Sequence, residues 1–411
     1  MRGAKWASIL FSSLAFLSVW WLLHSHRIRY AALWSFGLLA VSEAFLYRMS
    51  IPRVQSFSLA VLALGLNWLL GRQYTRLLPL AFLYVWLYDA FPLLLLLTAL
   101  TCLAEWLIEH RLEARPLLFA AVGTFLGLVI NPYFPHDVLF ILRHLLPKLT
   151  ETTAVNVGSE WYPYQTTQLM ENSPLALVAF LMGVLALGLQ ERRMDLRTAS
   201  TFFAAVLFGA MLFQSRRFIE YFPAFALIFA AFAWHPLLDD RPTLLVSPWR
   251  KPFSLLTNRS TLSAVALVLC LLPGTWLTLK DAQTSMKTSK PYQLYEQASF
   301  WLQENTPAGA RVFQTDWDDF PRLFYYNTHN TYLIGLDPTY LQLYNPDLYD
   351  LWVKITRGEV ESPSHVIATR FAARYIITDL KHQAFIDMAG QDPGLQQVFR
   401  DGEAIVYQVV E

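Results

Sequence analysis

The stretch "VNVGSEWYPYQ", residues 155–165, lies between two segments that are apolar enough to cross a lipid bilayer. It carries one acid, Glu160, among polar and aromatic residues. Trp161, Tyr162 and Tyr164 are typical of side chains that anchor a membrane protein at the lipid headgroups. Anchoring does not explain Glu160, so the meaning of the stretch depends on the side of the membrane on which it lies.

The composition around this stretch is that of a membrane protein. Of 411 residues, 55% are hydrophobic and only 15% are charged, against about 25% charged in soluble domains. The formal net charge is +1, which gives no reason to expect a nucleic-acid partner. Cys102 and Cys270 both lie in apolar runs, where packed thiols are expected rather than a disulfide or a metal site.

Apolar runs of membrane-spanning length predict a polytopic α-helical protein with about ten spans. The run at 77–108 is too long for one crossing, and Pro92 predicts a break into two helices with Asp89 at the turn. The first run follows a basic N-terminus, but no small-residue cleavage site is evident, so we expect a retained helix. The runs are 6–23, 31–47, 53–70, 77–108 in two parts, 116–131, 174–190, 198–213, 217–234 and 261–279.

Basic residues predict the orientation of these spans, because arginine and lysine concentrate in short cytoplasmic loops. They gather in alternate connections, which we therefore place inside. The loop 132–173, with the stretch quoted above, then faces outward, as does everything after about residue 280. The basic residues used are Arg72, Arg76, Arg111, Arg115, Arg192, Arg193, Arg197, Arg241, Arg250, Lys251 and Arg259.

The same alternation places Met1 outside, which is unusual for a chain with no signal sequence. We therefore hypothesise that an upstream helix and its outer loop are missing from this chain. An upstream genomic sequence with no in-frame hydrophobic segment would refute this hypothesis.

The composition changes near residue 291, where apolar residues shorten to strand-sized runs among acids, amides and prolines. "QLYEQASFWLQENTP" predicts an amphipathic helix, "ARVFQT", "TYLIG", "RYIIT" and "AIVYQVV" predict strands, and helical patterns occupy 338–355, 364–372 and 382–389. We therefore predict a membrane module at 1–280 and an extracytoplasmic α/β domain at 291–411.

Four arginines break the expected scarcity of positive charge in outer loops. Arg48 and Arg53 flank one short outer turn, and Arg216 and Arg217 lie together at another. A guanidinium stays charged and its fork of donors matches phosphate oxygens, so these residues are candidates for a phosphate site. The alternative is that they extend toward lipid headgroups, as basic residues near span ends commonly do.

Acids and a histidine fall on the same predicted side as these arginines. Such groups can remove a proton from an acceptor hydroxyl or bind a divalent cation such as Mg²⁺ or Mn²⁺. The alternative for Asp89, and for His136 with Asp137, is capping of the helices that follow them. No glycine-rich phosphate loop or nucleophile elbow is present, which argues against a nucleotide-driven pump or a serine hydrolase. The candidates are Glu43, Asp89, His136, Asp137 and Glu160.

Two outer motifs resemble the GT-C superfamily of lipid-linked glycosyltransferases, with the nearest resemblance to the catalytic subunit of oligosaccharyltransferase. "NVGSEWYP" resembles the family's Ser-Val-Ser-Glu type motif, with Glu160 at the acid position. In "SRRFIEYFP", Arg216 or Arg217 matches the late outer arginine that holds the lipid-phosphate leaving group in the family.

The C-terminal part resembles the soluble domain of the same family, which opens with a helix, a Thr-Pro, a strand and then Trp-Trp-Asp-Tyr-Gly. In "WLQENTPAGARVFQTDWDDFP", Trp317 and Asp318 match the Trp-Asp of that motif. Asp316 stands in place of the first Trp, and Asp319 with Phe320 in place of Tyr-Gly, which leaves recognition of an Asn-X-Ser/Thr peptide open. The alternative is a strand-to-loop turn with solvated acids.

The resemblance implies sugar transfer from a polyprenyl-phosphate-linked donor, on the outer face of a bacterial or archaeal plasma membrane, to a glycan, lipid or protein acceptor. Glu160 would position the acceptor or a metal, Asp89 or an absent N-terminal acid would act as base, and Asp318 is a further acceptor or metal candidate. The family's first outer loop carries an acid that this sequence lacks. The alternatives are a non-catalytic membrane scaffold of the same fold and, less favoured, a transporter, whose polar groups should lie at the midplane.

Overall fold

The computed structural model describes residues 2–150, 158–190, 193–238, 259–288 and 290–410. Four of the basic residues used for orientation, Arg192, Arg241, Arg250 and Lys251, lie outside these ranges, as do residues 155–157 of the quoted stretch. The chain divides into two compact units: Met1–Leu142 with Ser159–Thr288, and Arg143–Gly158 with Ser289–Glu411. We call them the helical unit and the mixed unit.

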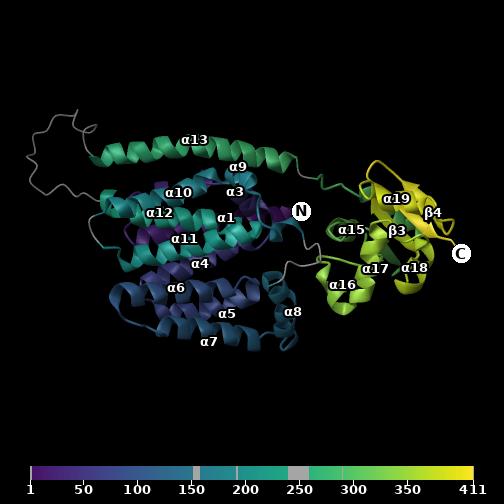
Figure 1. Ribbon diagram of the computed structural model, residues 1–411, viewed down its shortest axis with the longest axis horizontal. Coiled ribbons are helices and arrows are strands. Elements are labelled where there is room, and N and C mark those ends of the chain that lie inside the picture. Colours follow the sequence, from purple (N-terminus) through teal and green to yellow (C-terminus); the bar gives the residue numbers. More distant parts are fainter. Residues whose placement is uncertain (1, 151–157, 191–192, 239–258, 289, 411) are drawn as a thin grey trace, which may run out of the picture. The chain divides into compact units, whose positions relative to one another are not determined.

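The helical unit is a bundle whose helices run side by side (Figure 1). Short 3₁₀ turns connect some of them: η1 (Gly37–Leu39), η2 (Tyr74–Arg76), η3 (Ser159–Trp161) and η4 (Arg216–Glu220). The division between the units falls within α8 (His136–Thr150). The other helices are α1 (Arg2–Ser25), α2 (Ala31–Phe36), α3 (Glu43–Ser50), α4 (Gln55–Leu70), α5 (Leu77–Leu87), α6 (Pro92–Glu109), α7 (Arg115–Val129), α9 (Thr166–Asn172), α10 (Pro174–Leu189), α11 (Leu196–Gln214), α12 (Phe222–Leu238) and α13 (Arg259–Lys287).

Within the described ranges, four helices are long and apolar enough to cross a membrane: α1, α6, α11 and α13. Two bent pairs, α3 with α4 and α9 with α10, bring the number to six if each pair is one broken span. The apolar helices α5, α7 and α12 are shorter. The predicted polytopic helical membrane architecture is confirmed at this level.

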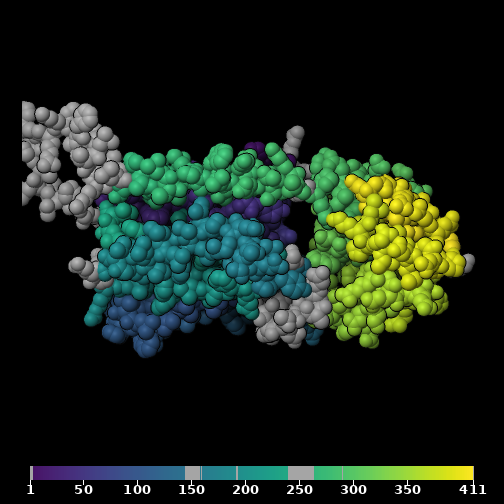
Figure 2. All heavy atoms as spheres, turned by 45° about the horizontal axis from the view of Figure 1, so that its top comes forward, coloured from purple at the N-terminus to yellow at the C-terminus, as the bar shows by residue number. Residues whose placement is uncertain are grey.

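The core of the helical unit surrounds α12, which packs against α10 and α11. Every residue from Phe222 to Ala233 is buried, as expected for a helix that is apolar on all sides. By contrast, α13 touches the rest of the unit mainly through α3 and η1, and in the space-filling view it lies along one side of the bundle (Figure 2). Its exposed side chains include Leu269, Leu272 and Trp276.

The break predicted at Pro92 is confirmed, whereas the single span predicted at 31–47 is wrong. Pro92 is the first residue of α6, where its missing N–H costs no hydrogen bond. In the region 31–47 the chain forms α2, the turn η1 and then α3. A new helix begins because the Ser42 hydroxyl accepts a hydrogen bond from the Phe45 N–H at 3.1 Å. α4 follows at a bend of 106°.

The mixed unit contains a five-stranded sheet of order β2-β1-β3-β5-β4. β1 pairs in parallel with β2 and β3, while β5 is antiparallel to β3 and β4. Leu302 of α14 packs under the sheet with Val312 of β1 and Val406 of β5. The elements are α14 (Glu296–Asn305), β1 (Arg311–Gln314), α15 (Phe320–Tyr326), β2 (Thr331–Tyr332), α16 (Thr339–Tyr344), α17 (Pro346–Thr356), α18 (Pro363–Arg370), β3 (Tyr375–Asp379), α19 (Gln383–Ala389), β4 (Leu395–Arg400) and β5 (Ala404–Val409).

The predicted strands and helices of this region form as expected, but β4 and α15 were missed. β4 has the sequence "LQQVFR" and a mostly exposed burial pattern, so it lacks the apolar alternation that identifies a strand. α15 begins at Phe320, directly after the acids for which a turn was the alternative interpretation.

Close helix packing in the helical unit depends on two glycines of α7. A Cβ at Gly123 would lie 2.2 Å from the Leu78 carbonyl oxygen, and one at Gly127 would lie 2.8 Å from that of Phe82. Both obstacles are backbone atoms of α5, which cannot rotate away. The four-residue spacing is the small-xxx-small pattern that lets membrane helices approach closely.

We therefore expect Gly123→Ala to force α5 and α7 apart and to destabilise the protein by about 1–3 kcal/mol, the usual cost of overpacking. The matched control is Gly188→Ala in α10, where an added Cβ meets nothing within 4 Å, and alanine should be neutral or stabilising in a helix. Thermal unfolding of the detergent-solubilised variants measures both effects. Equal midpoints for the two variants would contradict the close packing of α5 and α7.

A candidate phosphate site in the helical unit

Three guanidinium groups converge on the Glu160 carboxylate. Arg48 and Arg53 reach Oε2 at 2.9 and 3.1 Å, and Arg217 reaches Oε1 at 3.4 Å. Arg48 lies in the last turn of α3 and Arg53 in the bend before α4. The bend between α3 and α4 thus places both arginines close together, Arg48 just before it and Arg53 within it.

The loops that carry Glu160 and Arg217 are held together by hydrogen bonds to backbone carbonyls. The Arg216 N–H donates to the Tyr162 carbonyl at 3.0 Å, and the Ser215 hydroxyl donates to the Glu160 carbonyl at 3.0 Å. The Arg216 side chain donates to the Pro163 carbonyl at 3.1 Å and lies over the Tyr164 ring. η3 and η4 are therefore fixed against each other, although more than fifty residues separate them in the sequence.

Aromatic rings complete the surroundings of Arg217. Its Nη2 donates to the Tyr88 hydroxyl at 2.7 Å, and its guanidinium lies 4.7 Å from the centre of the Trp161 ring. Trp161 therefore contacts a cation, besides any anchoring role at the membrane surface.

Glu220 is a member of this group that the sequence interpretation missed. It lies in η4, is 1% exposed, and its Oε1 accepts two hydrogen bonds from Arg48, from Nε at 2.9 Å and from Nη2. Its Oε2 has no hydrogen-bond partner. The available signal was an acid in the apolar sequence "RRFIEYFP", because ionisable groups at such positions are generally paired or functional.

The group carries more positive than negative charge, with four arginines against Glu160 and Glu220. Burial alone would raise the pKa of Glu160, but the guanidinium groups of Arg48, Arg217 and Arg53 outweigh it and hold the pKa below its usual range. Glu160 is therefore a stabilised carboxylate and a weak base. The surplus positive charge suits an anion, and Arg53, with 55% of its side chain exposed, is the most accessible of the three arginines bound to Glu160.

The other predicted residues of the helical unit are not part of this group. Asp89 is exposed in the turn between α5 and α6, and α6 has no side-chain cap. His136 is exposed at the start of α8. Asp137 does not cap α8 as we expected, since neither carboxylate oxygen has a hydrogen-bond partner. Glu43 accepts a hydrogen bond from Ser285 at 2.6 Å beside a shallow cavity of about 250 Å³.

Asp318 lies in the mixed unit, in a turn with Asp316 and Asp319. Among the residues that the structure describes, these form the one group of His, Cys, Asp or Glu side chains close enough to hold a metal ion. Asp318 is exposed, but Asp319 is buried, so the acids are not all solvated as the simple turn interpretation expects. Burial, together with the charges of Asp316 and Asp318, raises the pKa of Asp319 to about 7.

No protein-family model and no curated protein matches the sequence. Solved structures do match. The apo oligosaccharyltransferase of Archaeoglobus fulgidus has a TM-score of 0.65 at 14% identity over 95% of this chain and 60% of its own. The same enzyme, AglB, in complex with an inhibitory peptide and a dolichol-phosphate gives 0.63 at 12% identity, with the same coverages. ArnT from Cupriavidus metallidurans bound to undecaprenyl phosphate gives 0.57 at 14% over 99% of this chain and 84% of its own.

The chain has the fold of the GT-C lipid-linked glycosyltransferases. The sequence resemblance to this superfamily is thus confirmed at the level of fold. The chain spans about three fifths of the length of the oligosaccharyltransferase.

The lowered pKa of Glu160 makes a prediction about pH. Because the folded pKa lies below the ordinary value of 4.5, the ionised carboxylate stabilises the fold above that pH, and the stabilisation is lost as the pH falls below it. Glu160→Gln should therefore cost about 1–3 kcal/mol at pH 7, and the deficit should shrink toward pH 4. Glu109→Gln, which removes an exposed ion pair with Arg72, is the control and should cost less than about 1 kcal/mol. A deficit that does not change with pH would contradict the ion-pair assignment.

Proposed function

We propose that this chain is a membrane glycosyltransferase that binds the phosphate of a polyprenyl-phosphate-linked sugar at the group formed by Arg48, Arg53, Arg216 and Arg217. The group faces outward, with the mixed unit also on the outer side. The convergence of guanidinium groups on one loop carries the proposal, because such groups stabilise the charge that develops on a departing phosphate. The dolichol-phosphate and undecaprenyl phosphate bound by the similar structures support the same ligand class.

The carboxylates take different roles in this proposal. Glu160 organises the arginines, since both of its oxygens are already engaged by guanidinium groups, and a carboxylate held in that way is poorly suited to remove a proton. Asp89 is the better base, because it is exposed and makes no hydrogen bond or ion pair with any described residue. Asp89 follows Tyr88, whose hydroxyl accepts a hydrogen bond from Arg217. The turn that carries Asp89 therefore lies next to the proposed phosphate site.

A divalent cation does not fit at Glu160 in this arrangement. Arg48, Arg53 and Arg217 surround the carboxylate, and their charges would repel Mg²⁺ or Mn²⁺. We therefore assign the stabilisation of the leaving phosphate to the arginines alone. The acceptor, which we propose to be a glycan, lipid or protein, would approach from the side of Asp89.

Phosphate binding can be tested with two arginines at opposite ends of α4. Arg53 precedes the helix and pairs with Glu160, while Arg72 follows it and pairs with Glu109. Their side chains are similarly exposed, at 55% and 50%. We expect Arg53→Gln to weaken binding of undecaprenyl phosphate by about tenfold or more, the loss of one charge-assisted hydrogen bond.

Arg72→Gln removes the same charge and should leave that affinity unchanged. Both variants should bind undecaprenol, which lacks the phosphate, with the same affinity as the unmodified protein. Binding is measured on the purified full chain in detergent. Equal losses in the two arginine variants would mean that the charge acts nonspecifically, and the phosphate assignment would then fail.

The base is tested by turnover. We expect Asp89→Asn to lower kcat by on the order of a hundredfold, the usual scale of general-base loss. Glu160→Gln should act mainly on KM, because it disturbs the arginines that hold the donor. The measurement is release of polyprenyl phosphate from a polyprenyl-phosphate-linked sugar, with membrane glycans as acceptor. A kcat that is unchanged in Asp89→Asn would remove Asp89 from the mechanism.

A further inference from the structure

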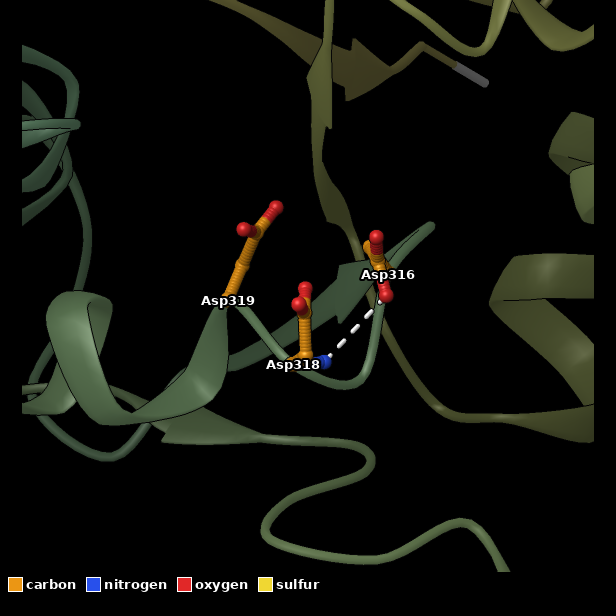
Figure 3. A group of neighbouring side chains, drawn as sticks. All are labelled: Asp316, Asp318 and Asp319. Carbon is orange, nitrogen blue, oxygen red and sulfur yellow. Dashed lines mark hydrogen bonds between the residues drawn. The ribbon is translucent and has the colours of Figure 1, made fainter. Parts of the chain in front are cut away.

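Three carboxylates meet in the turn that follows β1. Asp316, Asp318 and Asp319 project from this short segment (Figure 3), and one oxygen of each lies within 4.8 Å of the others. Oxygen ligands sit about 2.3–2.6 Å from a Ca²⁺ ion, so ligands on opposite sides of one ion lie up to about 5 Å apart. The separation is therefore that of oxygens able to share a single cation.

A second observation is independent of this spacing. Asp319 is only 5% exposed, and its Oδ1 is buried with no hydrogen-bond partner. No described residue donates a hydrogen bond to that oxygen. A buried acceptor with no donor is costly, and a bound cation would satisfy it.

The position of the turn in the sheet points the same way. From β1 the chain passes to β2 on one side and later returns to β3 on the other, so the carboxyl ends of β1 and β3 lie at a topological switch point, where open α/β sheets bind ligands. Asp379 ends β3, and its Oδ1 lies 2.6 Å from the His382 ring. The Thr315 hydroxyl, directly before the turn, donates a hydrogen bond to the Thr378 hydroxyl at 2.8 Å, which places the end of β3, with Asp379, beside the turn.

Among the described residues, the charges of the turn are only partly compensated. Lys290 approaches Asp318 at 4.0 Å, and His382 is already paired with Asp379. Three carboxylates at mutual contact repel one another, and carboxylate oxygens are the ligands that hard divalent cations prefer. We propose that Asp316, Asp318 and Asp319 bind one hard divalent cation, of the Ca²⁺ or Mg²⁺ class. This site lies within the mixed unit and does not depend on the proposed phosphate binding.

Trp317 provides a direct probe, because it lies between two of the ligands in the sequence. Tb³⁺ substitutes for Ca²⁺ and luminesces when a nearby tryptophan transfers energy to it. We expect the purified full chain, stripped with a chelator, to give sensitised Tb³⁺ luminescence. Competition by CaCl₂ and by MgCl₂ identifies the preferred ion. Trp317→Phe should abolish the luminescence but keep the rise in thermal midpoint that Ca²⁺ or Mg²⁺ produces.

Ligand variants complete the test. Asp318→Asn should lower the affinity for Tb³⁺ by at least about tenfold, since even outer-shell changes at metal sites cost that much. The control is Asp350→Asn, an exposed acid of α17 in the same unit, which should bind as the unmodified protein does. Asp319→Asn removes a buried charge, so its thermal midpoint without cation should equal or exceed that of the unmodified protein, while the response to cation is lost.

This result for Asp319→Asn distinguishes a metal ligand from an acid with a structural role. Loss of a structural acid would lower the thermal midpoint both with and without the cation. The proposal is overturned if the unmodified chain shows neither sensitised luminescence nor a cation-dependent midpoint. It is also overturned if the cation response survives in both Asp318→Asn and Asp319→Asn.

Discussion

The Arg48 guanidinium joins three parts of the chain that are far apart in the sequence. It extends from the last turn of α3, donates two hydrogen bonds to Glu220 in η4, and donates another to Glu160 in η3. Its side chain is 15% exposed and that of Glu220 is 1% exposed, so the pair is removed from water. Losing one partner of such a pair is costly, because the other charge is left buried without compensation. The positions of η3 and η4 therefore depend on this arginine.

This constraint explains why the span that begins at residue 31 is interrupted. A continuous helix through residues 31–47 would carry Arg48 onward along the same axis. Instead Ser42 starts a new helix, the chain turns sharply before α4, and Arg48 and Arg53 both reach Glu160. An arrangement of four arginines with two glutamates is favourable at this place only because the carboxylates neutralise part of the charge. What remains is a surplus of positive charge, which the proposed phosphate ligand would compensate.

The sequence predicted those features that depend on local patterns. Pro92 marked the division between α5 and α6, strand-sized apolar runs located β1, β2, β3 and β5, and unexpected outer arginines identified most of the site. It did not predict the break before α3, because apolar residues continue through this region and the new helix is marked by the hydrogen bond of Ser42. β4 was missed because its side chains are mostly exposed. Glu220 was missed because its role depends on hydrogen bonds from Arg48, which lies 172 positions away in the sequence.

The helical unit and the mixed unit show opposite forms of the same physical problem. Arginines outnumber acids around Glu160, whereas acids outnumber bases around Asp319, and in both places a buried carboxylate oxygen, in Glu220 and in Asp319, has no hydrogen-bond partner. The buried charge of Glu220 is compensated by its ion pair with Arg48, a residue of the same unit. Among the described residues, no cation forms an ion pair with Asp319, and Lys290 pairs with the exposed Asp318. The arginine group is therefore organised by ion pairs within the chain, whereas the proposed cation would supply positive charge that the acidic turn lacks.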